Sequence, residues 1–251
     1  MRKVIVAVLS IAFLLLSTPV WAITNGQPDG NKHPEVGALV GTFSSGTFPY
    51  CSGTLISPTV FLTAAHCNIG TSTVNVTFDS QYSPKSKLYT GTYIANPNYN
   101  QSQNDPQDIA VVIFKNAIPN LTPAKLPTLG QLDNVAKDQQ FTAVGYGGTR
   151  PTGQTGGQNF TYPDIREYAA STFNSIGPGY LRLSQNASTD NGGTCYGDSG
   201  GPNFLGAGAS ETTVIAATTI TGDTPCKSTN VDYRLDTQSA RAFLGQYVAL
   251  P

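Results

Sequence analysis

Short apolar runs separated by turn residues recur along most of the chain, a pattern typical of all-β proteins. Residues 60–65 are almost continuously apolar, as expected for a buried strand, whereas residues 74–78 alternate as in a half-buried strand. The expected strands are 36–41, 52–56, 60–65, 74–78, 108–114, 140–146 and 212–220. Residues 149–159 are rich in glycine and are expected to form a surface loop.

One helix is expected near the C-terminus, at residues 237–248, with Asp236 as its cap. Its apolar residues recur at helical spacing: Ala240, Phe243, Leu244, Tyr247 and Val248. Residues 116–133 mix proline, leucine and polar residues without a clear period. The boundary between two β-rich halves is therefore expected there.

The first residues have the pattern of a signal peptide. A basic start is followed by an almost wholly apolar run at 4–16 and by small residues at Val20 and Ala22. The apolar run is too short for a spanning helix, so cleavage after Ala22 is expected rather than an uncleaved membrane anchor. Residues 1–22 are thus the expected signal peptide. Residues 23–251 are the expected mature protein, secreted and extracellular, with no membrane association after cleavage.

Charge and cysteine content narrow the class of protein. The sequence has 14 Lys and Arg against 15 Asp and Glu and no basic patch, so no nucleic-acid partner is expected. The spacing of its four cysteines, Cys51, Cys67, Cys195 and Cys226, fits no zinc motif. In an exported chain they are expected to form two disulfides, and arithmetic alone allows three pairings.

A serine among glycines is the first candidate for chemistry. Residues 197–201 read Gly-Asp-Ser-Gly-Gly, where backbone amides can approach a reacting atom at Ser199. The same residues satisfy the G-x-S-x-G rule of α/β-hydrolases, but that fold needs a histidine after the serine. The two histidines, His33 and His66, both lie upstream, and only Asp29 could supply the aspartate of a subtilisin-like order. What remains is the order His66, an aspartate, then Ser199.

Three motifs in that order resemble those of chymotrypsin/trypsin-type serine proteases. They are Leu62-Thr63-Ala64-Ala65-His66-Cys67, Asp108-Ile109-Ala110-Val111 and Gly197-Asp198-Ser199-Gly200-Gly201-Pro202. The resemblance extends over nearly all of the mature sequence. It implies an all-β fold of two packed antiparallel six-stranded β-barrels, the first at about 23–125 and the second at about 126–235, followed by the C-terminal helix, with the catalytic residues in the cleft between the barrels.

The resemblance implies a catalytic triad of His66, Asp108 and Ser199, and elementary chemistry agrees. Serine is a weak nucleophile that needs a base within hydrogen-bond reach, which His66 would supply. Asp108 would orient the imidazole and stabilise its protonated form. Backbone N–H groups of Gly197 and Ser199 would form the oxyanion hole. His33 has no catalytic counterpart and is interpreted as structural.

The family pattern also implies pairings that the residues alone leave open. It pairs Cys51 with Cys67 and Cys195 with Cys226. Cleavage before Ile23 would create an ammonium group that, in the family, pairs with the carboxylate preceding the serine, here Asp198.

The expected substrate pocket is formed by Gly193, Thr194, Tyr196, Thr221 and Val231. Trypsin-like relatives carry an aspartate where this chain has Gly193, so cleavage after uncharged apolar or aromatic residues is expected rather than after Lys or Arg. A basic preference would return if Asp232 faced into the pocket.

The sequence thus predicts a serine endopeptidase that acts through an acyl-enzyme. Its expected partners are peptide or protein substrates, with proteinaceous inhibitors as further candidates, and the enzyme is expected to be a monomer. No cofactor or metal is expected, because the stretch at 79–87, where some relatives bind calcium, has one carboxylate and two lysines. The alternative is a catalytically silent relative that acts as a binding module.

Overall fold

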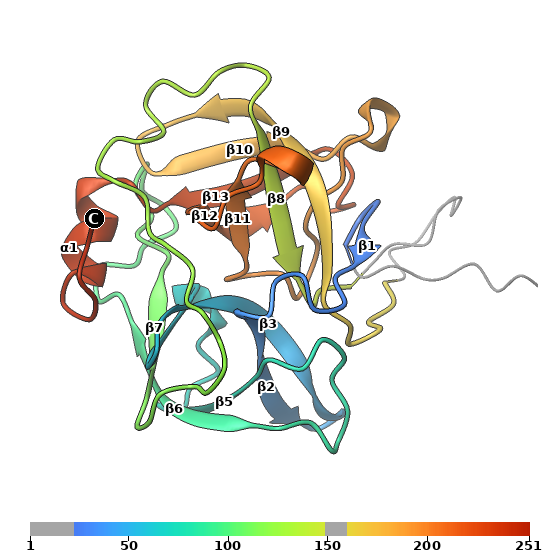
Figure 1. Cartoon of the computed structure of the whole chain (residues 1–251), viewed down its shortest axis with the longest axis vertical. Helices are drawn as coiled ribbons and strands as arrows, with labels where there is room; N and C mark the ends of the chain where they lie inside the picture. Colours follow the sequence, from blue (N-terminus) through green and yellow to red (C-terminus); the bar gives the residue numbers. More distant parts are fainter. Residues whose placement is uncertain (1–22, 149–159) are drawn as a thin grey trace, which may run out of the picture.

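The computed structural model describes residues 23–148 and 160–251. The expected signal peptide at 1–22 and the expected loop at 149–159 therefore lie outside the described residues. Within them the all-β prediction is confirmed: two antiparallel β-barrels pack against each other and a short helix follows the second (Figure 1).

The first barrel is built from one continuous part of the chain. Its strands are β2 (Val36–Phe43), β3 (Gly46–Ser57), β4 (Val60–Thr63), β5 (Thr73–Thr77), β6 (Tyr89–Ala95) and β7 (Ala110–Phe114). They close in the order β2-β3-β4-β7-β6-β5, with every pair antiparallel. Phe61 lies fully buried inside, edge-on to Phe78 at 5.7 Å between ring centroids.

The second barrel contains the later strands. They are β8 (Gln140–Gly145), β9 (Glu167–Ile176), β10 (Tyr180–Ser184), β11 (Pro202–Leu205), β12 (Ile215–Gly222) and β13 (Thr229–Arg234). The order β9-β10-β13-β12-β11-β8 closes because β8 also pairs with β9. The short first strand, β1 (Gln27–Pro28), pairs with the start of β9. Residues 27–28, near the start of the described part, therefore pair with the second barrel, whereas the expected division put them in the first (Figure 1).

Several strands of the second barrel carry polar residues that the structure buries. Asn230 and Asp232 in β13 are fully buried, and Arg234 is 7% exposed. From the sequence alone, a segment with these polar residues would be placed on the surface. In the fold their polar groups are satisfied by contacts with distant parts of the chain, which no local pattern reveals. This is why β13 has no counterpart among the strands expected from apolar runs.

The one α-helix in the described residues, α1 (Gln238–Leu244), is shorter than expected and has a different cap. Thr237, not Asp236, is the N-cap, and its side chain accepts the N–H of Ala240 at 3.2 Å. Asp236 instead binds the Arg234 guanidinium and the N–H of Leu132. Short 3-10 helices lie at Ala65–Cys67, Ala187–Thr189 and Gly208–Ser210. In the described part of the chain no helix is long and apolar enough to cross a membrane.

Candidate active site

His66 and Asp108 are brought together by neighbouring strands of the first barrel. Strand β4 ends at Thr63, and a 3-10 turn at Ala65–Cys67 then carries His66. Asp108 lies two residues before β7, which pairs antiparallel with β4 so that Thr63 lies opposite Ala110. The turn that follows one strand and the segment that leads into the other therefore meet at the same edge of the barrel.

The Asp108 carboxylate holds His66 at two points. One oxygen lies 2.8 Å from Nδ1 of the ring, and the other accepts the backbone N–H of His66 at 3.0 Å. The Asp108 side chain is 1% exposed, whereas that of His66 is 24% exposed. An ionised carboxylate only accepts hydrogen bonds, so Nδ1 carries the proton and Nε2 is left as the basic nitrogen.

The loop that carries Ser199 belongs to the second barrel but packs tightly against the first. Ser199 accepts the N–H of Ser52 through its carbonyl oxygen at 2.8 Å. Gly200 has a φ of +84°, and an added Cβ there would lie 2.2 Å from Oγ1 of Thr63 and 2.4 Å from the Ser52 carbonyl oxygen. Only glycine fits this approach, because any side chain would separate the two barrels.

The serine loop presents two N–H groups that are unused within the described structure. Asp198 donates its N–H to the Cys195 carbonyl and Gly200 to that of Thr219. The intervening N–H of Ser199 and that of Gly197, which has a φ of +98°, are donated to no other described residue. Unpaired amides beside a candidate nucleophile are the arrangement that an oxyanion hole requires.

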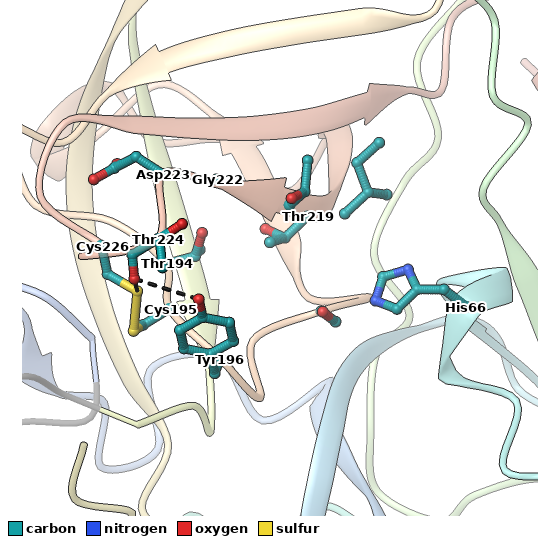
Figure 2. A pocket seen from close by; sticks show the side chains of 12 residues that line it. His66, Thr194, Cys195, Tyr196, Thr219, Gly222, Asp223, Thr224 and Cys226 are labelled. Atoms are coloured by element: carbon teal, nitrogen blue, oxygen red, sulfur yellow. Dashed lines mark hydrogen bonds between the residues drawn. A yellow bond between two sulfur atoms is a disulfide. The ribbon is translucent and has the colours of Figure 1, made fainter. Parts of the chain in front are cut away.

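His66 and Ser199 line one cavity of about 390 Å³. Figure 2 shows His66 at one end of this cavity and the disulfide between Cys195 and Cys226 at the other. Of the expected pocket residues, Thr194, Tyr196 and Thr221 line it. The Tyr196 hydroxyl donates to the Thr224 carbonyl at 3.3 Å (Figure 2). Ile220 and Asp223 also line the cavity, beside residues that the sequence had indicated.

Two other expected pocket residues, Gly193 and Val231, are not among those that line the cavity. A Cβ on Gly193 would lie 2.3 Å from Oε1 of Gln185, so the Gln185 side chain occupies the space beside it. Gln185 had no sequence signal, since nothing in its local pattern indicates this contact. Val231 lies on β13 opposite Thr221 and is half-buried.

Asp232 is fully buried behind the cavity rather than among its lining residues. It lies on β13 opposite Thr219, and Oδ1 accepts the Asn203 amide at 2.7 Å. Burial raises the pKa of Asp232 to about 8, outweighing hydrogen bonds from Thr219, Asn203 and Asn230. The neutral acid is therefore favoured near pH 7, and no negative charge is presented to the cavity from this side chain.

The structure contains two disulfides within its described residues. Cys51 of β3 is bonded to Cys67, at the end of the 3-10 turn that carries His66. Cys195, close to Ser199, is bonded to Cys226. By loop-closure entropy each bond contributes on the order of 3 kcal/mol to the free energy of unfolding. Cys51, His66 and Cys67 lie close enough together to resemble a metal site, but sulfurs in a disulfide are not available as thiolate ligands.

In the uncut chain Ile23 has a peptide nitrogen and not an ammonium group, so the expected pair of Ile23 and Asp198 stays a prediction. The backbone nitrogen of Ile23 donates to Oε2 of Glu167 at 2.8 Å. The Asp198 carboxylate accepts the N–H groups of Gly147 and Cys195, both at 2.8 Å. Burial raises the pKa of Asp198 to about 7, and the nearby Glu167 carboxylate adds to the rise. Sequence reasoning missed Glu167, which opens a strand that the apolar pattern did not reveal.

His33 lies in a separate buried cluster of charged groups. Its Nδ1 contacts the Asp29 carboxylate, and its Nε2 lies 2.7 Å from Oε1 of Glu211. Asp29 also binds the fully buried Arg166 at 2.7 Å. Burial opposes protonation of the ring, but hydrogen bonds to Asp29 and Glu211 outweigh it and raise the pKa of His33.

Comparisons with known proteins agree with this arrangement. A family model described as Trypsin matches residues 27–242. A trypsin from Phaedon cochleariae is 33% identical over 180 residues, which cover 61% of this chain and 63% of its own. An ovochymase from Halocynthia roretzi is 28% identical over 95 residues, 38% of this chain and 6% of its own. The chain thus spans less than two thirds of the length of these relatives.

A solved structure of HL collagenase superposes with a TM-score of 0.68, covering 89% of this chain and 97% of its own. The two sequences are 20% identical, so this likeness bears on the fold alone. Because the family match extends over most of the sequence, the chain belongs to the trypsin family of serine proteases.

Proposed function

We propose that the protein is a secreted serine endopeptidase that hydrolyses peptide bonds through an acyl-enzyme on Ser199. The observation that carries the proposal is the buried Asp108 carboxylate at 2.8 Å from Nδ1 of His66, in a cavity that His66 and Ser199 both line. Family membership supports the same class of reaction, and two disulfides support export. Peptides or proteins are the proposed substrates of a monomeric enzyme, and proteinaceous inhibitors are candidate competitors.

Proton transfer follows from the orientation of His66. Nε2 takes the hydroxyl proton as the Ser199 oxygen attacks the carbonyl carbon, and the imidazolium is stabilised by Asp108 at Nδ1. His66 then gives that proton to the departing amine as the carbon–nitrogen bond breaks. In the second half of the reaction His66 takes a proton from the water that attacks the acyl-enzyme. It returns this proton to the Ser199 oxygen as the bond between that oxygen and the acyl carbon breaks and the carboxylic acid leaves.

The negative charge that develops on the carbonyl oxygen falls beside the N–H groups of Gly197 and Ser199. Neither N–H group donates a hydrogen bond to another described residue, so no such bond has to break when the oxyanion forms. Preorganised donors of this kind stabilise the transition state more than the substrate, which is what accelerates the reaction.

Cleavage after uncharged side chains is part of the proposal. Gly193 brings no carboxylate, Gln185 fills the space next to it, and Asp232 lies buried with its neutral form favoured. Threonines and Ile220 supply much of the cavity lining. A Lys or Arg side chain placed there would find no ionised carboxylate at Gly193 or Asp232. Asp223 also lines the cavity, but its carboxylate already accepts the backbone N–H groups of Lys227, Ser228 and Thr229.

Covalent labelling tests the reaction class. A serine-directed fluorophosphonate should label the secreted protein once, and peptide mapping should place the label on Ser199. A substrate library should then show cleavage after apolar or aromatic residues. Absence of labelling in folded protein would favour the silent binding module, and strong cleavage after Lys or Arg would refute only the specificity.

A further inference from the structure

Two buried threonines form part of the wall of the candidate active-site cavity (Figure 2). Thr194 is 5% exposed and Thr219 is 3% exposed, whereas Thr221 and Thr224, which also line the cavity, are exposed to solvent. A threonine hydroxyl has one proton to donate and two lone pairs with which to accept. The direction in which a buried hydroxyl gives its proton therefore decides what the wall offers to a substrate side chain.

Thr194 gives its proton to a residue behind the wall. Its Oγ1 donates to Oδ1 of Asn230 at 2.5 Å, and Asn230 is fully buried and is not among the residues that line the cavity. The Thr194 hydroxyl oxygen accepts no hydrogen bond from a described residue. Thr194 can therefore accept a hydrogen bond from a group in the cavity but has no proton left to donate to it.

The orientation of the Asn230 amide is set by a chain of buried polar groups. Its Nδ2 donates to Oδ1 of Asn203 at 3.2 Å. Nδ2 of Asn203 in turn donates to Oδ1 of Asp232 at 2.7 Å and to Oγ1 of Thr219 at 3.0 Å. Asn203 and Asp232 are fully buried as well. Turning the Asn230 amide over would place two carbonyl oxygens against each other, so its Oδ1 stays toward Thr194.

We infer that Asn230 is a positioning residue for substrate selection: by taking the hydroxyl proton of Thr194, it leaves that point of the buried wall with an acceptor and no donor. The inference deepens the proposed endopeptidase function and rests on it. Among uncharged side chains, one that ends in a donor, such as the amide of glutamine, gains a hydrogen bond to Thr194. A carboxylate of the same length meets an oxygen without a proton, and an unpaired charge is costly to bury.

The test uses three peptides that differ only in the residue before the cleaved bond, which is Gln, Glu or Met, side chains of similar length. The value of kcat/KM is measured at pH 7 for the wild type and for Asn230→Leu, whose side chain has the same branching but accepts no proton. The freed Thr194 hydroxyl can then donate into the cavity. The ratio of kcat/KM for the Glu peptide to that for the Gln peptide should rise by about tenfold, as expected for one hydrogen bond to a charged group.

Thr194→Val in the Asn230→Leu protein is the matched control, because Val keeps the shape of the side chain and removes the hydroxyl. This double variant should lose the gain with the Glu peptide. A merely structural effect of Asn230→Leu would lower kcat/KM for all three peptides together and leave their ratios unchanged. Unchanged ratios in folded Asn230→Leu, or a gain that survives Thr194→Val, would overturn the inference.

Thr194→Val alone gives a second decision if Asn230→Leu does not fold. Loss of the acceptor should lower kcat/KM for the Gln peptide relative to the Met peptide by about fivefold, the worth of one neutral hydrogen bond. Thr194→Ser keeps the hydroxyl and should keep the wild-type ratio. The same ratio in Thr194→Val as in the wild type would overturn the inference.

Fluorophosphonate labelling of the wild type separates the two proposals. A folded wild type that takes no label contradicts the endopeptidase. A labelled wild type that does not cleave the Gln peptide, or whose ratios do not respond to these substitutions, contradicts only the role of Asn230.

Discussion

Replacing Arg166 by Met should cost the protein a large part of its stability. The guanidinium is fully buried and binds Asp29 at 2.7 Å through Nε. It also donates to carbonyl oxygens of Val36, Phe78 and Gly30, at 2.9, 3.1 and 3.1 Å. These acceptors belong to the first barrel and the N-terminal segment, whereas Arg166 precedes β9 of the second barrel. One side chain therefore joins three parts of the chain.

The expected loss follows from what the substitution leaves behind. Met fills a similar volume but offers no donor, so Asp29 keeps only His33 as a charged partner. The buried Val36 carbonyl and the less buried carbonyls of Phe78 and Gly30 each lose a hydrogen bond. Breaking a buried ion pair on one side costs about 3–5 kcal/mol of unfolding free energy. For a chain of this size that corresponds to a fall in Tm of about 6–20 °C.

Urea unfolding at pH 7 with intact disulfides measures this loss, in a Ser199→Ala background that prevents self-digestion. Arg182→Met is the matched control, because that guanidinium is only partly buried, over the Tyr180 ring at 5.2 Å. The control should lose less than about 1 kcal/mol. Adding Asp29→Asn to Arg166→Met should recover part of the loss, since an amide is less costly to bury than an unpaired carboxylate. A loss below about 1 kcal/mol for Arg166→Met would refute the reasoning.

Three further outcomes are expected. Ser199→Ala and His66→Ala should each abolish nearly all peptide hydrolysis, and the double variant should be only slightly less active than either, because the two residues act as a unit. Near-wild-type cleavage by either single variant would contradict the proposed triad. Because the pKa of His33 is raised in the folded protein, the contribution of His33 to stability is complete below about pH 6.5 and is lost as pH rises through the folded-state pKa. In urea titrations, His33→Gln should therefore lower the free energy of unfolding more at pH 6 than at pH 9. An equal loss at both pH values would be contrary evidence. Gly200→Ala should lower activity and Tm together because its Cβ meets Oγ1 of Thr63 at 2.2 Å, and retention of both would show that the loop can move aside.

The fold class and the candidate triad were accessible from sequence because their signals are local. The apolar run before His66 and the glycines around Ser199 each occupy a few consecutive residues. Glu167 gave no such signal, because its contact with Ile23 spans 144 residues and it opens a strand of mixed polarity. Gln185 lies beside Gly193, but the partners that hold it there come later in the chain: its N–H donates to the Ser228 carbonyl and its side-chain amide to Asp223. Asp232 appeared as a candidate pocket charge because its burial depends on neighbours from β11 and β12.

The pairing of β1 with β9 has a consequence for the order in which the protein can assemble during synthesis. All strands of the first barrel lie between Val36 and Phe114, so this barrel can close as soon as that segment has left the ribosome. Residues 27–28 must wait for β9, made only after Glu167 has been added. Residues 27–28 are thus among the last to reach their final position, and a partly synthesised chain holds an assembled first barrel with no completed cleft.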